Sequence, residues 1–186
     1  LLKSLGTRQS LLLVNPTRAS NKVANLARVE QTIVIRRNID ENLWKLNRQG
    51  YLNGHTPFSA ELAFLAILAA ELWGGLQVVA SNERSADEGN VIYLGQKINH
   101  QFSKSYAFET AMEKYVKKYI SAEASYSSFL RPLWEIQISK IFANYPKYFN
   151  VFLSCNKGQR QDRWCGRCPK CLSTFILLYP FLGEKV

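Results

Sequence analysis

The sequence lacks the features of a membrane-spanning or secreted protein. Its longest apolar stretch, Leu62 to Ala70, is bounded by Glu61 and Glu71 and is far too short to cross a bilayer. Cysteine is scarce, with 4 in 186 residues, whereas small secreted domains are dense in disulfides. We see no signal peptide, internal repeat or low-complexity tract. We therefore expect a cytoplasmic protein without a membrane span.

Acidic residues are in the minority, with 14 Asp and Glu against 24 Lys and Arg, which gives a formal net charge of +10. Such a charge favours anionic partners, namely nucleic acid, nucleotides or anionic lipids. Hydrophobic residues make up 47% of the chain, with 10 Phe, 9 Tyr and 4 Trp, so a sizeable core is available and a disordered chain is excluded. The length suits one domain, or one domain with a small appendage.

The few cysteines are all gathered in one short stretch, "SCNKGQRQDRWCGRCPKC". Cys155 is followed by nine residues, and Cys165, Cys168 and Cys171 then follow in two C-x-x-C steps. Four thiolates at such spacing can close a tetrahedron around Zn²⁺, and a closed site of four sulfurs is structural because no position is left for substrate. A redox pair, two disulfides or unconnected thiols are the alternatives that the residues leave open.

The first part of the chain follows an alternating strand and helix rhythm. Apolar, β-branched runs predict strands at Ser10 to Val14, Gln31 to Arg36 and Leu76 to Ser81. An Ala- and Leu-rich helix is expected between Thr56, its candidate N-cap, and Gly74. This order predicts βαβ units and an α/β fold, with part of a doubly wound parallel sheet in residues 1–100.

The chain after residue 100 is predicted to be helical and to carry the zinc site. Apolar residues at helical spacing mark three faces that we expect to be buried. These faces consist of Phe108, Met112, Tyr115 and Tyr119; of Trp134, Ile138, Ile141 and Tyr145; and of Leu172, Phe175, Ile176 and Tyr179. The stretch Asn150 to Ser154 is expected to be a further strand that leads to Cys155.

Polar residues follow the predicted strands, where open parallel sheets bind their ligands. The candidates at strand ends are Asn15, Asn82 and Glu83. Two further groups of candidates are Asn53, His55 and Thr56 at the start of a helix, and His100, Ser103 and Lys104 in a loop. Free N–H groups at a helix start attract phosphate or carboxylate. Each group also has an ordinary interpretation as a turn, a helix cap or a solvated charge run.

Five stretches together resemble one family: "LNGHTPFSA", "SNERSA", "NHQFSKS", "RPLWEIQISKIF" and "SCNKG…WCGRCPKC". It is the UDP-N-acetylmuramoyl-L-alanyl-L-glutamate epimerase family, of the ATP-pyrophosphatase (PP-loop) type with a HUP-like fold. The likeness runs from "LLLVNPT" to "CLSTFILLYPFL". The cysteine cluster is also similar to the zinc site of 7-cyano-7-deazaguanine synthase, another PP-loop enzyme.

The resemblance implies a reaction that depends on ATP and Mg²⁺. A glutamate carboxylate of a UDP-linked muramoyl dipeptide is adenylated, the α-hydrogen becomes acidic, and inversion and hydrolysis follow. The Ser-Gly-Gly-Lys-Asp-Ser-like turn that holds pyrophosphate in this family is absent. We expect it upstream of Leu1, so this segment alone is expected to be inactive.

Proton transfer at the α-carbon requires a base, and the strand-end loops offer few titratable groups. We expect His100 to act, with His55 and Glu83 as the other catalytic candidates. Asn15 and Asn82 are assigned to the nucleotide. Asn53, Thr56, Ser103 and Lys104 are assigned to the substrate.

Two other functions stay open at this point. Another adenylating PP-loop enzyme, acting on tRNA or a base, would suit the positive charge. A zinc-bearing module that only binds nucleic acid would need exposed aromatic residues beside its cations. Most aromatic residues here fall on core-like helical faces, which counts against a nucleic-acid partner. The oligomeric state cannot be read from the sequence.

Overall fold

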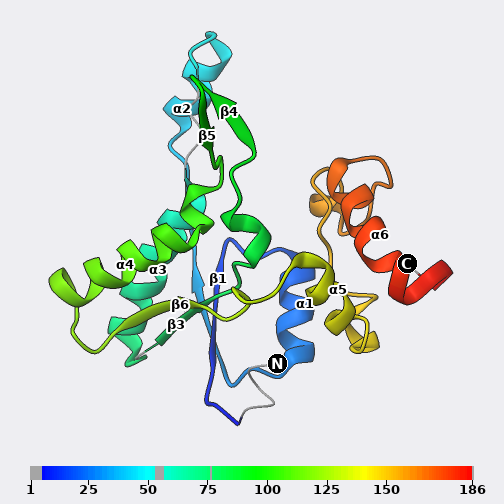
Figure 1. Cartoon of the computed structure of the whole chain (residues 1–186), viewed down its shortest axis with the longest axis horizontal. Helices are drawn as coiled ribbons and strands as arrows, with labels where there is room; N and C mark the ends of the chain where they lie inside the picture. Colours follow the sequence, from blue (N-terminus) through cyan, green and yellow to red (C-terminus); the bar gives the residue numbers. More distant parts are fainter. Residues whose placement is uncertain (1–5, 53–56, 76, 186) are drawn as a thin grey trace. The chain divides into compact units, whose positions relative to one another are not determined.

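The computed structural model describes residues 6–52, 57–75 and 77–185 of the chain (Figure 1). The chain divides into two compact units. The first comprises Leu1–Val34, Ser81–Ser85 and Ser128–Val186, and the second comprises Ile35–Ala80 and Ala86–Ser127. Each unit is described by itself below. The assignment of residues 1–100 and 101–186 to separate domains stays a prediction.

The first unit begins with a strand–helix–strand element: β1 (Ser10–Val14), α1 (Arg18–Ala27) and β2 (Gln31–Ile35). The two strands pair in a parallel two-stranded sheet. Thr17 caps α1 by accepting a hydrogen bond from the Ser20 N–H. The helix ends at Arg28, whose left-handed backbone (φ 51°) lets its N–H donate to the Asn25 carbonyl. Both strands lie where the sequence predicts them.

The rest of the first unit is built from short helices around an aromatic cluster. These are α5 (Glu135–Phe142), η4 (Pro146–Tyr148), η5 (Gln159–Gln161), α6 (Pro169–Leu182) and η6 (Gly183–Lys185). Helices α5 and α6 pack on each other. Phe142 contacts both Phe149 and Phe152, and Phe152 in turn meets Trp164 edge to face at 5.3 Å between ring centroids.

The prediction of a strand from Asn150 to Ser154 is wrong. The N–H groups of Val151 and Phe152 both donate to the Tyr148 carbonyl, at 3.0 and 2.9 Å. A backbone that closes such a turn cannot offer these donors to a neighbouring strand. Cys155 is therefore reached through a turn and an irregular segment.

The second unit has a helical core with two small sheets. Its elements are α2 (Glu41–Arg48), α3 (Phe58–Trp73), β3 (Gln77–Ala80), β4 (Val91–Tyr93), β5 (Gln96–Ile98), η3 (Phe102–Lys104), α4 (Tyr106–Tyr119) and β6 (Ser125–Ser128), while η2 (Arg84–Asp87) leads in from the first unit. Strands β3 and β6 form a parallel pair. Strands β4 and β5 are antiparallel, with Val91 opposite Ile98. Helix α3 ends at Gly74 (φ 72°), as the sequence predicts.

The core of the second unit lies between α3, α4 and the β3–β6 sheet. Its buried members are Ala63, Ile67, Met112, Val116, Ala124 and Tyr126, with Val78, Ala80 and Phe108 packed against them. The predicted burial of Phe108 and Met112 is thus confirmed. The predicted burial of Tyr115 and Tyr119 on the same helical face is wrong, because 46% and 63% of their surfaces are exposed.

The prediction that the apolar face of α6 is buried is wrong as well. Leu172, Phe175, Ile176 and Tyr179 are all exposed, and Leu178 is the residue of this helix that is buried. Helix α6 is apolar on more than one side, so packing one side on α5 leaves the other open. On the face of Trp134, Ile138, Ile141 and Tyr145, the last three are half-buried and Trp134 is 37% exposed.

The chain is therefore a mixed α/β protein with two parallel strand pairs and one antiparallel hairpin among the described residues. Within that part of the chain, no helix combines the length and the apolarity that a membrane crossing needs.

Candidate functional site

The four cysteine sulfurs lie close together in the first unit. The Sγ–Sγ distances are 3.9 Å for Cys155–Cys168, 3.8 Å for Cys165–Cys171 and 3.5 Å for Cys168–Cys171, and all four atoms lie within 4.8 Å of one another. A disulfide would require about 2.05 Å. Four sulfurs about 2.3 Å from a tetrahedral Zn²⁺ stand about 3.8 Å apart by geometry. The predicted cluster is confirmed, and its spacing fits a metal ion.

Backbone N–H groups point at these sulfurs. Gly158 and Cys165 donate to the Cys155 Sγ at 3.1 and 3.4 Å. Burial opposes ionisation of Cys155, but these donors lower the pKa of its thiol. The N–H of Cys171 is the main cause that lowers the pKa of Cys168 to about 6, whereas burial raises the pKa of Cys171. Two sulfurs are thus favoured as thiolates, the form that binds metals.

The loop between the first and second cysteine is closed tightly and tied to helix α1. A Cβ on Gly158 would lie 2.1 Å from the Arg163 carbonyl oxygen, so only glycine fits there. Asp162 has a left-handed backbone (φ 55°) and forms an ion pair with Lys22 of α1. At the other end of the cluster, Pro169 occupies the first turn of α6 and places Cys171 in the same turn.

The strand-end residues of the first unit have different surroundings. Asn15 follows β1 with a left-handed backbone (φ 46°) and is exposed. Asn82 is half-buried and its Nδ2 donates to the Ser128 Oγ at 3.1 Å. The Glu83 carbonyl accepts a hydrogen bond from Arg131 Nη1 at 3.1 Å. Arg131 was not among the expected site residues, although it begins the stretch "RPLWEIQISKIF".

A second cation lies beside this segment. The Arg84 guanidinium stands over the Trp134 ring at 5.1 Å from its centroid, and the Arg84 N–H donates to the Leu133 carbonyl at 2.8 Å. The Ser85 Oγ accepts from the Glu135 N–H at 3.4 Å and satisfies one open donor at the start of α5. Contacts with Ser128, Arg131 and Trp134 thus hold the segment that contains Asn82 and Glu83 in place.

The second unit holds His100, Ser103 and Lys104. His100 is exposed after the β4–β5 hairpin, and its Nδ1 lies 2.7 Å from Asn90 Oδ1. Since an amide oxygen only accepts, Nδ1 carries the proton and the lone pair is on Nε2. That Nε2 lies 3.4 Å from the amide nitrogen of Gln101. Ser103 and Lys104 lie in η3, directly before α4.

The remaining candidates, Asn53, His55 and Thr56, lie outside the described residues. The first unit thus contains Asn15, Asn82 and Glu83, and the second contains His100, Ser103 and Lys104. That Asn15, Asn82 and Glu83 face one crevice at the strand ends, with His55 and Thr56 nearby, stays a prediction.

Taken together, these features define a mixed α/β protein with a four-cysteine site able to hold a metal. Comparison with known families narrows this class. The MurL N-terminal domain matches residues 1–129, and the MurL C-terminal domain matches residues 151–186. The chain belongs to the MurL family.

Three curated relatives carry the name UDP-N-acetyl-alpha-D-muramoyl-L-alanyl-L-glutamate epimerase. The protein from Xanthomonas oryzae pv. oryzae is 45% identical over 148 residues, covering 76% of this chain and 33% of the relative. The protein from Salinispora tropica is 39% identical, covering 92% and 38%. The protein from a Micromonospora species is 36% identical, covering 92% and 39%. The chain thus spans well under half the length of these relatives.

Proposed function

We propose that this chain is part of an ATP-dependent epimerase that inverts the terminal L-glutamate of UDP-N-acetylmuramoyl-L-alanyl-L-glutamate in the cytoplasm, during synthesis of peptidoglycan precursors. Membership of the MurL family, with relatives that bear this epimerase name, is the observation that carries the proposal. Two parallel strand pairs agree with a doubly wound sheet of the PP-loop type, which we propose for the intact protein.

The chemistry requires activation of a carboxylate before inversion. A carboxylate oxygen of the terminal glutamate attacks the α-phosphorus of Mg²⁺-bound ATP, and pyrophosphate leaves. The resulting acyl adenylate delocalises the charge of an α-carbanion. A free carboxylate, which is already an anion, resists loss of the α-proton. A base then takes the α-proton, a proton returns on the opposite face, and water releases AMP and the D-glutamate product.

His100 is the base that we propose. Its Nδ1–H donates to Asn90 Oδ1, which places the lone pair on Nε2, and the Gln101 amide 3.4 Å from Nε2 must give way to the substrate. Lys104, at the end of η3, is proposed to bind an anionic group of the substrate, with Ser103 beside it. His55 and Glu83 are the alternative proton carriers. Asn15 and Asn82 are assigned to the nucleotide, and Asn53 and Thr56 to the substrate.

The cysteine cluster is proposed to bind Zn²⁺ through Cys155, Cys165, Cys168 and Cys171, in a site like that of 7-cyano-7-deazaguanine synthase. The sulfur spacing and the N–H donors support this assignment. All four positions of a tetrahedral ion would be filled by sulfur, so the ion would contribute folding energy. The cysteine side chains would hold the loop that follows Cys155 against the start of α6.

The proposal is tested with the full-length enzyme in D₂O, using ATP and the muramoyl dipeptide. NMR should show loss of the glutamate α-hydrogen, and His100→Ala should abolish this exchange while pyrophosphate release continues. Gln96→Ala, which changes an exposed side chain of the β4–β5 hairpin, is the matched control and should retain exchange. Undiminished exchange in His100→Ala would remove His100 from the mechanism and direct attention to His55. Absence of exchange and of pyrophosphate release in the unchanged enzyme would contradict the proposed reaction.

A further inference from the structure

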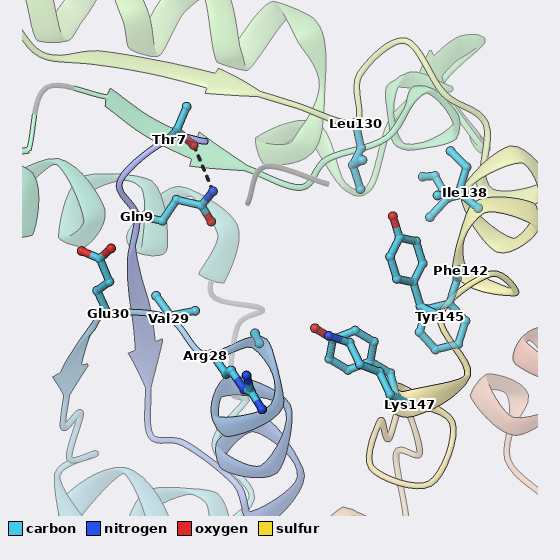
Figure 2. A pocket seen from close by; sticks show the side chains of 13 residues that line it. Thr7, Gln9, Arg28, Val29, Glu30, Leu130, Ile138, Phe142, Tyr145 and Lys147 are labelled. Atoms are coloured by element: carbon cyan, nitrogen blue, oxygen red, sulfur yellow. Dashed lines mark hydrogen bonds between the residues drawn. The ribbon is translucent and has the colours of Figure 1, made fainter. Parts of the chain in front are cut away.

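The first unit contains a cavity that none of the proposed catalytic residues lines. Its volume is about 590 Å³, within the range of roughly 300–1,000 Å³ that small-molecule sites occupy. One wall is formed by Leu130, α5 and the η4 turn. The other is formed by the residues before β1 and by the link from α1 to β2 (Figure 2).

The wall on α5 and η4 is apolar and aromatic with one cation. Phe142, Tyr145 and Tyr148 supply rings, and Ile138 and Ile141 line the same wall. Lys147 comes from the same turn, and Figure 2 shows its side chain reaching toward the opposite wall. Aromatic faces of this kind stack on nucleobases, because every base has a π face.

The opposite wall is polar. Gln9 donates from Nε2 to the Thr7 Oγ1 at 3.0 Å (Figure 2), which orients its amide and leaves the carbonyl oxygen of the side chain as an acceptor. Glu30 lies 3.6 Å from Arg8, with both side chains largely exposed. A carboxylate in a nucleotide site commonly accepts hydrogen bonds from ribose hydroxyls.

Arg28 lies on this wall in a conformation that arginine rarely adopts. Its φ of 51° is left-handed, at the end of α1, where glycine or asparagine is usual. A non-glycine residue held in this region costs on the order of 1 kcal/mol. The position thus keeps a guanidinium at the cavity despite a backbone preference for glycine.

We propose that this cavity binds the uridine diphosphate part of the substrate. The uracil stacks against Tyr145 and Phe142 and is read by the Gln9 amide, Glu30 accepts from the ribose, and Arg28 and Lys147 neutralise the pyrophosphate. Both a base-stacking wall and two cations line one cavity, which is the chemistry that recognises a nucleoside diphosphate. The choice of uracil rests on the proposed function, since the relatives are named for a UDP-linked substrate.

The test uses the full-length protein and UDP alone as the probe, with binding measured by calorimetry in the absence of ATP. Arg28→Gly removes the cation and places glycine at a left-handed position that favours it. We expect it to weaken UDP binding about tenfold or more, as loss of a charge-assisted hydrogen bond predicts. Lys147→Ala should act likewise. Arg18→Ala, at the other end of α1 and outside the cavity, is the matched control and should leave UDP affinity unchanged.

Steady-state kinetics supply the second measurement. Arg28→Gly should raise KM for the muramoyl dipeptide with little change in kcat, because the cavity holds a remote part of the substrate. UDP affinity that is unchanged in both cavity variants would overturn the proposal, as would ADP binding that both variants weaken as much as they weaken UDP binding. Failure of the epimerase proposal looks different: UDP would still bind and both variants would still weaken it, but no glutamate would be inverted.

Discussion

Gly158→Ala should destabilise the loop between Cys155 and Cys165 and thereby lower the free energy of unfolding of the protein. The new Cβ would meet the Arg163 carbonyl oxygen at 2.1 Å, its carbonyl carbon at 3.1 Å and the Cys155 Sγ at 3.3 Å. The first contact is with backbone, so the loop itself must open. The backbone angle of Gly158 is φ −98°, which alanine adopts readily, so the effect is steric alone.

The magnitude follows from what the opened loop loses. The Gly158 carbonyl accepts hydrogen bonds from the N–H groups of Gln161 and Arg163, both at 3.1 Å. Its own N–H donates to the Cys155 sulfur at 3.1 Å. Overpacking costs about 1–3 kcal/mol, and one lost hydrogen bond about 1 kcal/mol. We expect a loss of roughly 2–4 kcal/mol in the free energy of unfolding, and reduced zinc content.

The assay compares Gly158→Ala with Gly166→Ala in the full-length protein, by denaturant unfolding and by metal analysis. Gly166 lies in the same cysteine-rich loop, and a Cβ there meets no atom within 4 Å, although its φ of +69° disfavours alanine. The control should therefore lose only about 1 kcal/mol and keep its metal. Equal losses in the two variants, or full zinc content in Gly158→Ala, would refute the steric account.

Three further predictions concern the cysteine site and His100. In protein freed of metal by a chelator, the thiolate of Cys168 stabilises the fold, because its pKa is lowered from 9.0 to about 6. This stabilisation is fully present above pH 9.0 and is lost as the pH falls through about 6. Unfolding midpoints that rise toward acid pH would contradict this prediction. Lys22→Ala should lower the free energy of unfolding by no more than about 1 kcal/mol, since Lys22 is 53% exposed in its ion pair with Asp162; a loss several times larger in chemical denaturation would show that the pair does more. Asn90→Ala should lower kcat for inversion while ATP-dependent pyrophosphate release persists, because the tautomer of His100 is no longer fixed; an unchanged kcat would show that the 2.7 Å contact is irrelevant to the reaction.

Local patterns in the sequence proved sufficient for local structure. The spacing of Cys165, Cys168 and Cys171 fixes sulfurs on neighbouring turns, and the cluster with Cys155 is confirmed. Strand β1 and the end of α3 at Gly74 follow from an apolar run and a left-handed cap. These features depend on residues close in the chain, so periodicity and cap chemistry capture them.

Contacts between residues far apart in the sequence cannot be predicted from such local patterns. Arg131 meets the Glu83 carbonyl across 48 positions, and no local spacing indicates this contact. The sequence predicts burial for Tyr115, Tyr119 and the apolar face of α6, but these side chains are exposed. An apolar helical face predicts burial without indicating which element covers it. The apolar run from Asn150 to Ser154 predicts a strand, but the structure has a turn at Val151, because a short apolar run suits either structure until its hydrogen-bond partners are known.

The central claim is tested most directly by the configuration of the glutamate after reaction. The full-length protein is incubated with UDP-N-acetylmuramoyl-L-alanyl-L-glutamate, ATP and Mg²⁺, and the glutamate is released by acid hydrolysis and resolved by chiral chromatography. The account predicts D-glutamate, with AMP and pyrophosphate formed alongside it. Glutamate that remains entirely in the L configuration, while ATP and Mg²⁺ are present and the protein is folded, would contradict it.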